Sequence, residues 1–141
     1  MPPFLAIIRD TSVHLDFPST YHHVDTAIAT VSTFLRHKHI ACNVFALALV
    51  LREGMTNAIK HGNHENPGQR VVCELRVEPA ALHISIADEG PGFCWQRHRI
   101  EAVRAHVPHG RGLWLMHVYG FDVSHNSRGN VLFLQTALPH I

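Results

Sequence analysis

The sequence has few cysteines, no excess of charge of one sign and no long apolar run, and each shortage excludes a class of protein. There are 12 basic and 11 acidic residues, so the formal net charge is only +1. A nearly neutral chain without a basic stripe has no electrostatic basis for binding nucleic acid or an anionic membrane. No apolar run approaches the roughly 20 residues that a bilayer-spanning helix requires. We therefore expect a cytoplasmic protein that binds neither nucleic acid nor membrane.

Cysteine occurs only three times, at Cys42, Cys73 and Cys94, without the paired spacing of a metal site. Reduced structural thiols in a cytosolic protein are the interpretation that we favour. Histidine is frequent instead, with 14 residues, and a pair such as His61 and His64 has a spacing that can chelate zinc. A zinc site needs a third and a fourth ligand in a defined arrangement, which we do not find in the sequence. Surface histidines are therefore expected.

The remaining composition is typical of one folded domain. Of the 141 residues, 46% are hydrophobic and 16% are charged, which indicates a globular rather than a disordered chain. The sequence contains no internal repeat, no low-complexity tract and no linker. We therefore expect a single domain over residues 1–141 that buries most of its apolar surface.

Hydrophobic periodicity predicts two long helices and several short strands. The first helix is expected at about residues 20–37, with Ser19 as its N-cap, and the second at about residues 42–60. The second helix is apolar nearly all round, so we expect it to be central and buried. The other predicted elements are at least one strand before residue 18, strands at residues 70–77, 82–87, 122–126 and 131–138, and a helix at about residues 111–120.

These elements also predict the fold class. Helices and hairpins each need one covered face, and the stable solution is a small number of packed layers. The expected fold is α/β, more narrowly α+β: a two-layer sandwich in which helices cover one face of a mixed, mostly antiparallel sheet.

The segment LREGMTNAIKHG (residues 51–62) places a carboxylate and a carboxamide four residues apart, at Glu53 and Asn57. On a helix this spacing projects both side chains from the same face. An isolated pair of this kind is most often a capping or core-network pair, because polar groups buried without partners cost roughly 1–3 kcal/mol. The functional interpretation is that the Asn57 carbonyl oxygen binds Mg²⁺, while Glu53 acts as a base or orienting group for an attacking hydroxyl.

The segment IADEGPGF (residues 86–93) places Asp88 at the end of an apolar strand, ahead of Gly90 and Gly92. Taken alone, it is a turn of common composition. A carboxylate at a strand end can also accept a hydrogen bond from the exocyclic amine of adenine, and a glycine allows the backbone to approach a flat base. Phe93 can wall such a pocket or pack in the core.

The segment HGRGLWLM (residues 109–116) carries Gly110 and Gly112 at the start of a predicted helix, with Arg111 between them and Leu113 next. Backbone N–H groups at a helix N-terminus favour anions, and the arginine fork matches phosphate oxygens. A lone pair of glycines is weak support, because an ordinary loop-to-helix junction has the same pattern. The segment is not a P-loop, since no lysine follows the second glycine.

Taken in order, the three segments resemble the N-box and the two glycine boxes of the Bergerat ATP-binding fold, which includes gyrase, heat-shock chaperone ATPases, mismatch-repair ATPases and sensor histidine kinases. Within it, the chain is most similar to the single-domain anti-sigma-factor serine/threonine kinases of bacteria. REGMTNAIKHG resembles their E-x-x-x-N-A-x-x-H-G pattern, DEGPGF their D-x-G-x-G pattern and GRGLWLM their G-x-G-L-x-L-M pattern. The resemblance extends from about residue 18 to the C-terminus and implies a histidine-kinase-like ATP-binding domain.

The resemblance also implies roles for individual residues. Asn57 is expected to hold Mg²⁺ at the phosphates, Glu53 to activate a substrate hydroxyl and Asp88 to bind the adenine amine. The implied nucleotide-binding set comprises Asn57, Asp88, Gly90, Gly92, Phe93, Gly110, Arg111, Gly112, Leu113 and Asn130. Asn130 departs from the family pattern, which usually has threonine there, and Pro108 stands where many relatives have a basic residue.

The activity implied by the resemblance is that of an ATP-dependent protein serine/threonine kinase with Mg²⁺. Its substrate would be an anti-anti-sigma protein of the STAS fold, its second partner a sigma factor, and its role the regulation of transcription by partner switching. Relatives of this kind often form homodimers. Two alternatives stay open: a non-catalytic ATP-binding regulatory module, and the ATP-binding half of a split sensor histidine kinase. The sequence disfavours the last, because no helical hairpin with a phosphate-accepting histidine is found ahead of the domain.

Overall fold

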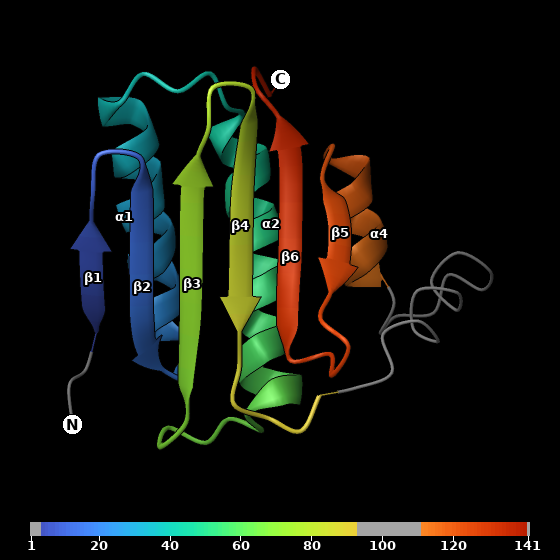
Figure 1. Cartoon of the computed structure of the whole chain (residues 1–141). Helices are drawn as coiled ribbons and strands as arrows, with labels where there is room; N and C mark the ends of the chain where they lie inside the picture. The colour runs from blue at the N-terminus through green and yellow to red at the C-terminus, as the bar shows by residue number, and fades with distance from the viewer. Residues whose placement is uncertain (1–3, 93–110, 141) are drawn as a thin grey trace.

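The computed structural model describes residues 4–92 and 111–140, with the backbone alone for residues 111 and 112, and its centre is a six-stranded sheet (Figure 1). The strand order is β1-β2-β3-β4-β6-β5, and every pairing between these neighbours is antiparallel. The bounds are Leu5–Ile8 for β1, Ser12–Pro18 for β2, Arg70–Val77 for β3, Ala81–Ala87 for β4, Asp122–His125 for β5 and Val131–Ala137 for β6. The predicted strands are confirmed, with small differences at their ends.

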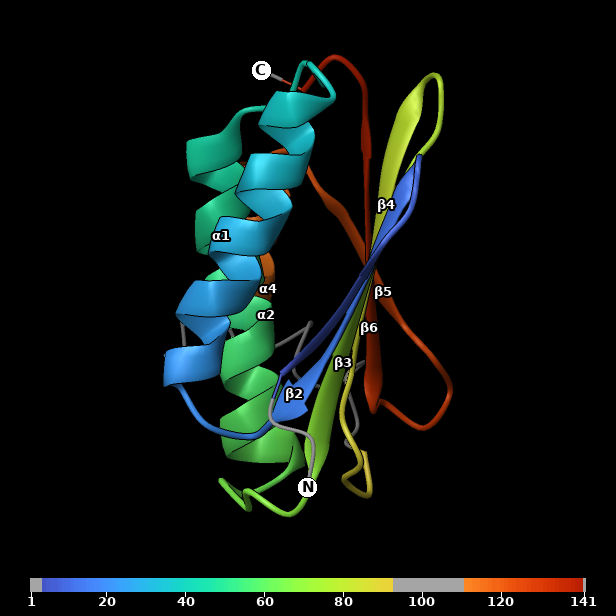
Figure 2. The same cartoon turned by 90° about the vertical axis from the view of Figure 1, so that its left-hand side faces the viewer.

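Three helices lie on one face of this sheet: α1 (His22–His37), α2 (Val44–Asn57) and α4 (Arg111–Val118). Figure 2 shows the two layers edge-on, and within the described residues no helix covers the other face of the twisted sheet. The predicted two-layer α/β sandwich with one helix-covered face is therefore confirmed. The sequence predicts a mixed, mostly antiparallel sheet, and the described pairings are all antiparallel.

The strands alternate in character because helices cover only one face of the sheet. In β2, the side chains of Val13, Leu15 and Phe17 are at most 1% exposed, whereas His14 and Asp16 between them are half-buried. A period of two residues is what a half-covered antiparallel sheet requires. The hydrophobic core therefore lies between the sheet and the helices.

The central helix α2 begins at an asparagine cap, close to the predicted start at Cys42. Asn43 has an extended backbone, and its side-chain oxygen accepts a hydrogen bond from the Ala46 N–H at 3.1 Å. The helix then continues directly into a π-helical turn, η1 (Ala58–Gly62). Such turns are rare and frequently mark functional sites.

The prediction that Ser19 caps the first helix is wrong. The N-cap of α1 is Tyr21, which makes no side-chain cap hydrogen bond. Ser19 is 3% exposed, its Oγ donates to the Gln69 carbonyl oxygen at 2.8 Å, and its backbone N–H donates to the same oxygen at 3.1 Å. Ser19 thus extends the contact between β2 and the segment before β3, and this long-range contact takes the place of a local cap.

Burial suppresses the chemistry of the described cysteines. It raises the pKa of the Cys42 thiol to about 11 and that of the Cys73 thiol to about 12, so both are protonated and weakly nucleophilic near neutral pH. Cys94 lies outside the described residues. In the described part of the chain, no three histidine, cysteine or acidic side chains gather as a metal site, and no helix has the length and apolarity to cross a bilayer.

We expect Leu51→Ala to lower the free energy of unfolding by about 2–5 kcal/mol, because it empties a fully buried position and leaves a cavity. Leu51 on α2 is 1% exposed, whereas Phe45 on the same helix is 73% exposed. The matched variant Phe45→Ala should change the free energy by about 0.5 kcal/mol or less. Urea unfolding followed by circular dichroism measures both, and equal losses would contradict the placement of α2.

Candidate functional site

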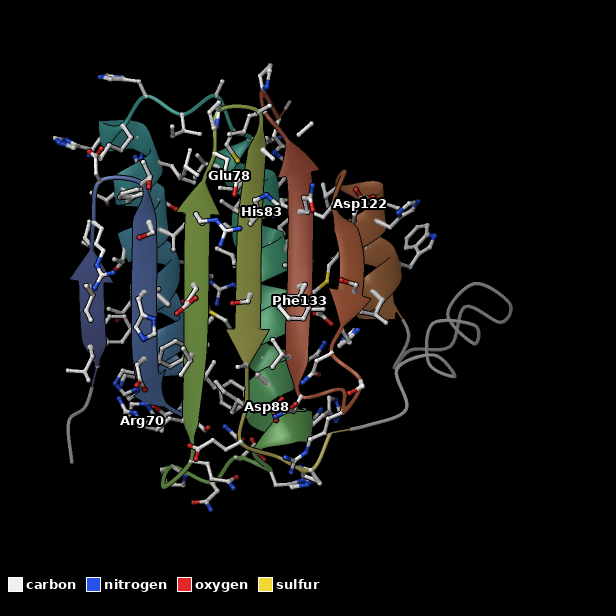
Figure 3. The ribbon with its side chains drawn as sticks, in the orientation of Figure 1. Arg70, Glu78, His83, Asp88, Asp122 and Phe133 are labelled. Atoms are coloured by element: carbon white, nitrogen blue, oxygen red, sulfur yellow. The ribbon has the colours of Figure 1, made fainter. Side chains whose placement is uncertain are left out.

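A cavity of about 300 Å³ lies where the end of α2 and the turn η1 meet the C-terminal end of β4 and the start of β6. Figure 3 labels Asp88 at the end of β4, beside the last turns of this helix. The lining consists of Gly54, Asn57, Ala58, His61, Gly62, Ile86, Asp88, Gly92, Leu113, Met116, His125, Gly129, Asn130 and Leu132. All three predicted segments contribute to it, since Asn57 belongs to the first, Asp88 to the second and Leu113 to the third.

A larger hollow of about 740 Å³ lies on the uncovered face of the sheet. It is lined by residues of the strands and the turn after β1, including His83, Asp122 and Phe133, which Figure 3 labels on this face. None of the three predicted segments contributes a described residue to its lining. The smaller cavity is therefore the better candidate, although the hollow on the sheet is larger.

On α2, Glu53 and Asn57 lie one turn apart and contact each other. The Asn57 Nδ2 donates a hydrogen bond to the Glu53 carboxylate at 3.2 Å, and both side chains are half-buried. Asn57 lines the cavity, whereas Glu53 does not. With its nitrogen turned toward Glu53, the Asn57 carboxamide has its oxygen left for a cation, and such an oxygen suits Mg²⁺.

Asp88 is half-buried at the end of β4, and one of its carboxylate oxygens already accepts a hydrogen bond. The donor is the Gly90 N–H, at 2.8 Å from Asp88 Oδ1. Burial raises the pKa of the Asp88 carboxyl above its ordinary value, and the Gly90 N–H, the Arg128 charge and His64 oppose this effect only in part. A partly desolvated carboxylate is a strong acceptor for a donor that enters the cavity.

Close backbone approaches around Asp88 require glycine. A Cβ on Gly62 would lie 2.2 Å from the Asp88 Cγ, and a Cβ on Gly90 would lie 2.0 Å from the Gly62 carbonyl oxygen. Gly92 has a φ of +87°, and a Cβ there would lie 1.8 Å from the Arg128 carbonyl oxygen. Gly62 and Gly90 therefore allow the end of η1 to lie against the residues that follow β4, and Gly92 allows a close approach to the turn before β6.

Asn130, the residue directly before β6, holds the backbone of Asp88. The Asp88 N–H donates to the Asn130 carbonyl oxygen at 3.0 Å, and the Asn130 Nδ2 donates to the Asp88 carbonyl oxygen at 3.3 Å. Sequence reasoning missed Asn126, whose Oδ1 accepts hydrogen bonds from the N–H groups of Gly129, Asn130 and Val131 at 2.9, 3.0 and 3.1 Å. An asparagine three residues before a glycine is a turn signal that could have indicated it.

The other predicted residues belong to α4 or precede it. Leu113 lines the cavity from α4. Arg111 and Gly112 are the first described residues of this helix, and only their backbone is described. Phe93 and Gly110 lie outside the described residues.

Comparison with known proteins finds a family model and several similar proteins. A family model described as a histidine kinase-like ATPase domain matches residues 17–136. The anti-sigma F factor of Geobacillus sp. (strain WCH70) is 30% identical over 82 residues, which cover 57% of this chain and 56% of that protein. The anti-sigma F factor of Bacillus subtilis (strain 168) is 29% identical over the same shares of both chains. The match thus spans little more than half the length of these relatives.

We expect Asp88→Asn to raise the melting temperature at neutral pH by about 1–3 °C. The folded protein holds the Asp88 pKa above 3.8, so folding disfavours the charged form. This unfavourable contribution is absent below the unfolded pKa and grows as the pH rises through the folded pKa. The new carboxamide oxygen can still accept from Gly90. Melting curves of both proteins between about pH 3 and about pH 7 should therefore diverge with rising pH; a wild type more stable than the variant at neutral pH would contradict this.

Proposed function

Because the chain belongs to the histidine kinase-like ATPase domain family, we propose that it binds ATP together with Mg²⁺ in the cavity between α2 and the ends of β4 and β6. One observation carries this proposal: the Asn57 carboxamide on a helix and the Asp88 carboxylate at a strand end line the same cavity of about 300 Å³. A cavity of this kind, mostly apolar with a few converging polar groups, is typical of a small-molecule site.

At the adenine end, the Asp88 carboxylate would accept a hydrogen bond from the exocyclic amine. Ile86, Met116 and Leu132 line the cavity and would pack against the faces of the flat ring. Asn130 takes the place of the usual threonine, and its side chain holds the Asp88 backbone. Gly90 keeps the second segment close to η1, and with Gly92 and Phe93 it would form the rest of the pocket wall.

At the phosphate end, the proposed metal ligand is the carbonyl oxygen of Asn57. Mg²⁺, when bound, would supply positive charge that neutralises the phosphates. Gly110, Arg111 and Gly112 would cover the phosphates with backbone N–H groups and a guanidinium, and Leu113 would pack beneath them. This assignment is supported by the place of Leu113, next to Gly112 on α4, in the cavity lining.

The proposed reaction is the transfer of the γ-phosphoryl group of ATP to a serine or threonine hydroxyl of a STAS-type anti-anti-sigma protein. The similarity to anti-sigma F factors supports this substrate class, with a sigma factor as second partner and partner switching as the means of regulating transcription. Glu53 would accept the proton of the attacking hydroxyl. The hydrogen bond from the Asn57 Nδ2 orients the Glu53 carboxylate beside the proposed metal ligand, the Asn57 carbonyl oxygen.

One observation favours a second candidate, a non-catalytic module that binds ATP to set partner affinity. Glu53 does not line the described cavity, and its carboxylate is engaged with Asn57. Both candidates predict ATP binding, but only the kinase predicts phosphoryl transfer to a partner.

We expect Glu53→Gln to keep ATP affinity within about twofold but to lower phosphoryl transfer by about 100-fold or more, because the amide cannot accept the hydroxyl proton. The assay measures label from γ-labelled ATP on a purified STAS-type anti-anti-sigma protein. Glu78→Gln is the matched control, since Glu78 lies at the other end of the sheet from Asp88 (Figure 3), and it should transfer normally. Equal transfer by Glu53→Gln would exclude Glu53 as the base, and no transfer by the wild type would favour the non-catalytic module.

We expect Asn57→Ala to weaken ATP binding in the presence of Mg²⁺ by about tenfold, because the proposed metal ligand is lost. Chelation of Mg²⁺ should weaken binding by the wild type but have little further effect on the variant. Isothermal titration calorimetry with and without the chelator tests this expectation. A variant that responds to Mg²⁺ as the wild type does would remove Asn57 from the metal site.

A further inference from the structure

Asn63 is a polar residue with no solvent exposure, and it directly follows the turn η1. Its Nδ2 donates hydrogen bonds to the Ser19 Oγ at 2.7 Å and to the Arg70 carbonyl oxygen at 3.0 Å. Its Oδ1 accepts a hydrogen bond from the Glu89 N–H at 2.8 Å. One side chain therefore ties together the end of β2, the start of β3 and the residue after Asp88.

The hydrogen bonds of Asn63 constrain the position of Asp88 from the side of the turn η1. Glu89 directly follows Asp88 in the chain. The hydrogen bond from the Glu89 N–H to Asn63 therefore fixes the peptide bond between Asp88 and Glu89. The contact of Gly62 with the Asp88 carboxylate and that of Gly90 with the Gly62 backbone lie immediately beside Asn63. Asn130 holds Asp88 from the other side, through the pairing of β4 with β6.

Burying a carboxamide is unfavourable unless its donors and acceptor are satisfied, and in Asn63 both the Nδ2 donors and the Oδ1 acceptor are hydrogen-bonded. An apolar side chain at this position would remove the hydrogen bonds to the Arg70 carbonyl oxygen and the Glu89 N–H. A fully satisfied buried network instead specifies one geometry. Here the network fixes how η1, which continues the helix that carries Asn57, packs against the end of β4, which Asp88 follows.

We propose that Asn63 is a positioning residue that aims the Asp88 carboxylate at the adenine amine by locking the end of η1 to the end of β4. This inference rests on the proposed binding of ATP and adds a determinant of purine specificity outside the cavity lining. It predicts that loss of Asn63 impairs recognition of the exocyclic amine more than affinity for triphosphate.

The test compares ATP with inosine triphosphate, which has an oxygen in place of the adenine amine, by calorimetry. The wild type should bind ATP more tightly, and Asn63→Ala should reduce that preference by about tenfold, as expected for one misaligned hydrogen bond. Thr136→Val is the matched control: Thr136 is 5% exposed and donates to the Gly120 carbonyl oxygen at 2.9 Å, at the end of β6 away from Asn130. Both variants should melt at lower temperature, but Thr136→Val should keep the ATP preference.

The outcomes separate the two claims. A wild type that binds neither nucleotide would overturn the proposed function itself. A wild type that prefers ATP, together with a folded Asn63→Ala variant that keeps the same preference, would overturn only the role of Asn63. If Asn63→Ala does not fold, Ser19→Ala removes one of the three hydrogen bonds of Asn63. A smaller loss of preference in that variant supports the inference, and an unchanged preference refutes it.

Discussion

The close packing of α2 on the sheet is the constraint on which the rest of the structure depends. A Cβ on Gly54 would lie 2.6 Å from the Ile86 Cδ1 on β4 and 3.2 Å from the Leu132 Cδ2 on β6. The missing side chain lets the helix lie directly on these two strands. The same approach brings Asn57 and the turn η1 to the end of β4, where Asp88 lies. A Cβ at position 54 would require the ends of the Ile86 and Leu132 side chains to shift.

Within the site, the burial of Asp88 disfavours the charged form of its carboxyl group. Asp88 is packed against Gly62 on one side, so its charged form loses solvation and its carboxyl pKa rises. The other side of Asp88 faces the cavity, where a ligand donor would compensate the lost hydration. Violations of the usual preference for solvated or paired charges are concentrated at functional sites. In the proposed function, the donor that meets this carboxylate is the exocyclic amine of adenine.

Much of the fold and the main polar groups of the cavity could be predicted, but the residues that support them could not. Ser19 shows why: a serine before a helix has the local pattern of a cap, yet its hydroxyl bonds to Gln69, far along the chain. Asn63 follows a glycine and reads locally as a turn residue, although its partners Ser19 and Glu89 are 44 and 26 residues away. Asn126 is different, because its bonds are local, and a closer look at its turn could have identified it.

By itself, the sequence determined the strands, the two long helices, the two-layer arrangement and the family, because each depends on near neighbours: the period of apolar residues and the order of short glycine-containing motifs. Only the tertiary structure decided which polar groups meet. It brought Asn57 and Asp88 to one cavity, left Glu53 outside the cavity lining and raised the pKa of Asp88. These properties depend on burial and on contacts between segments far apart in the chain, and no local pattern of residues encodes those distances.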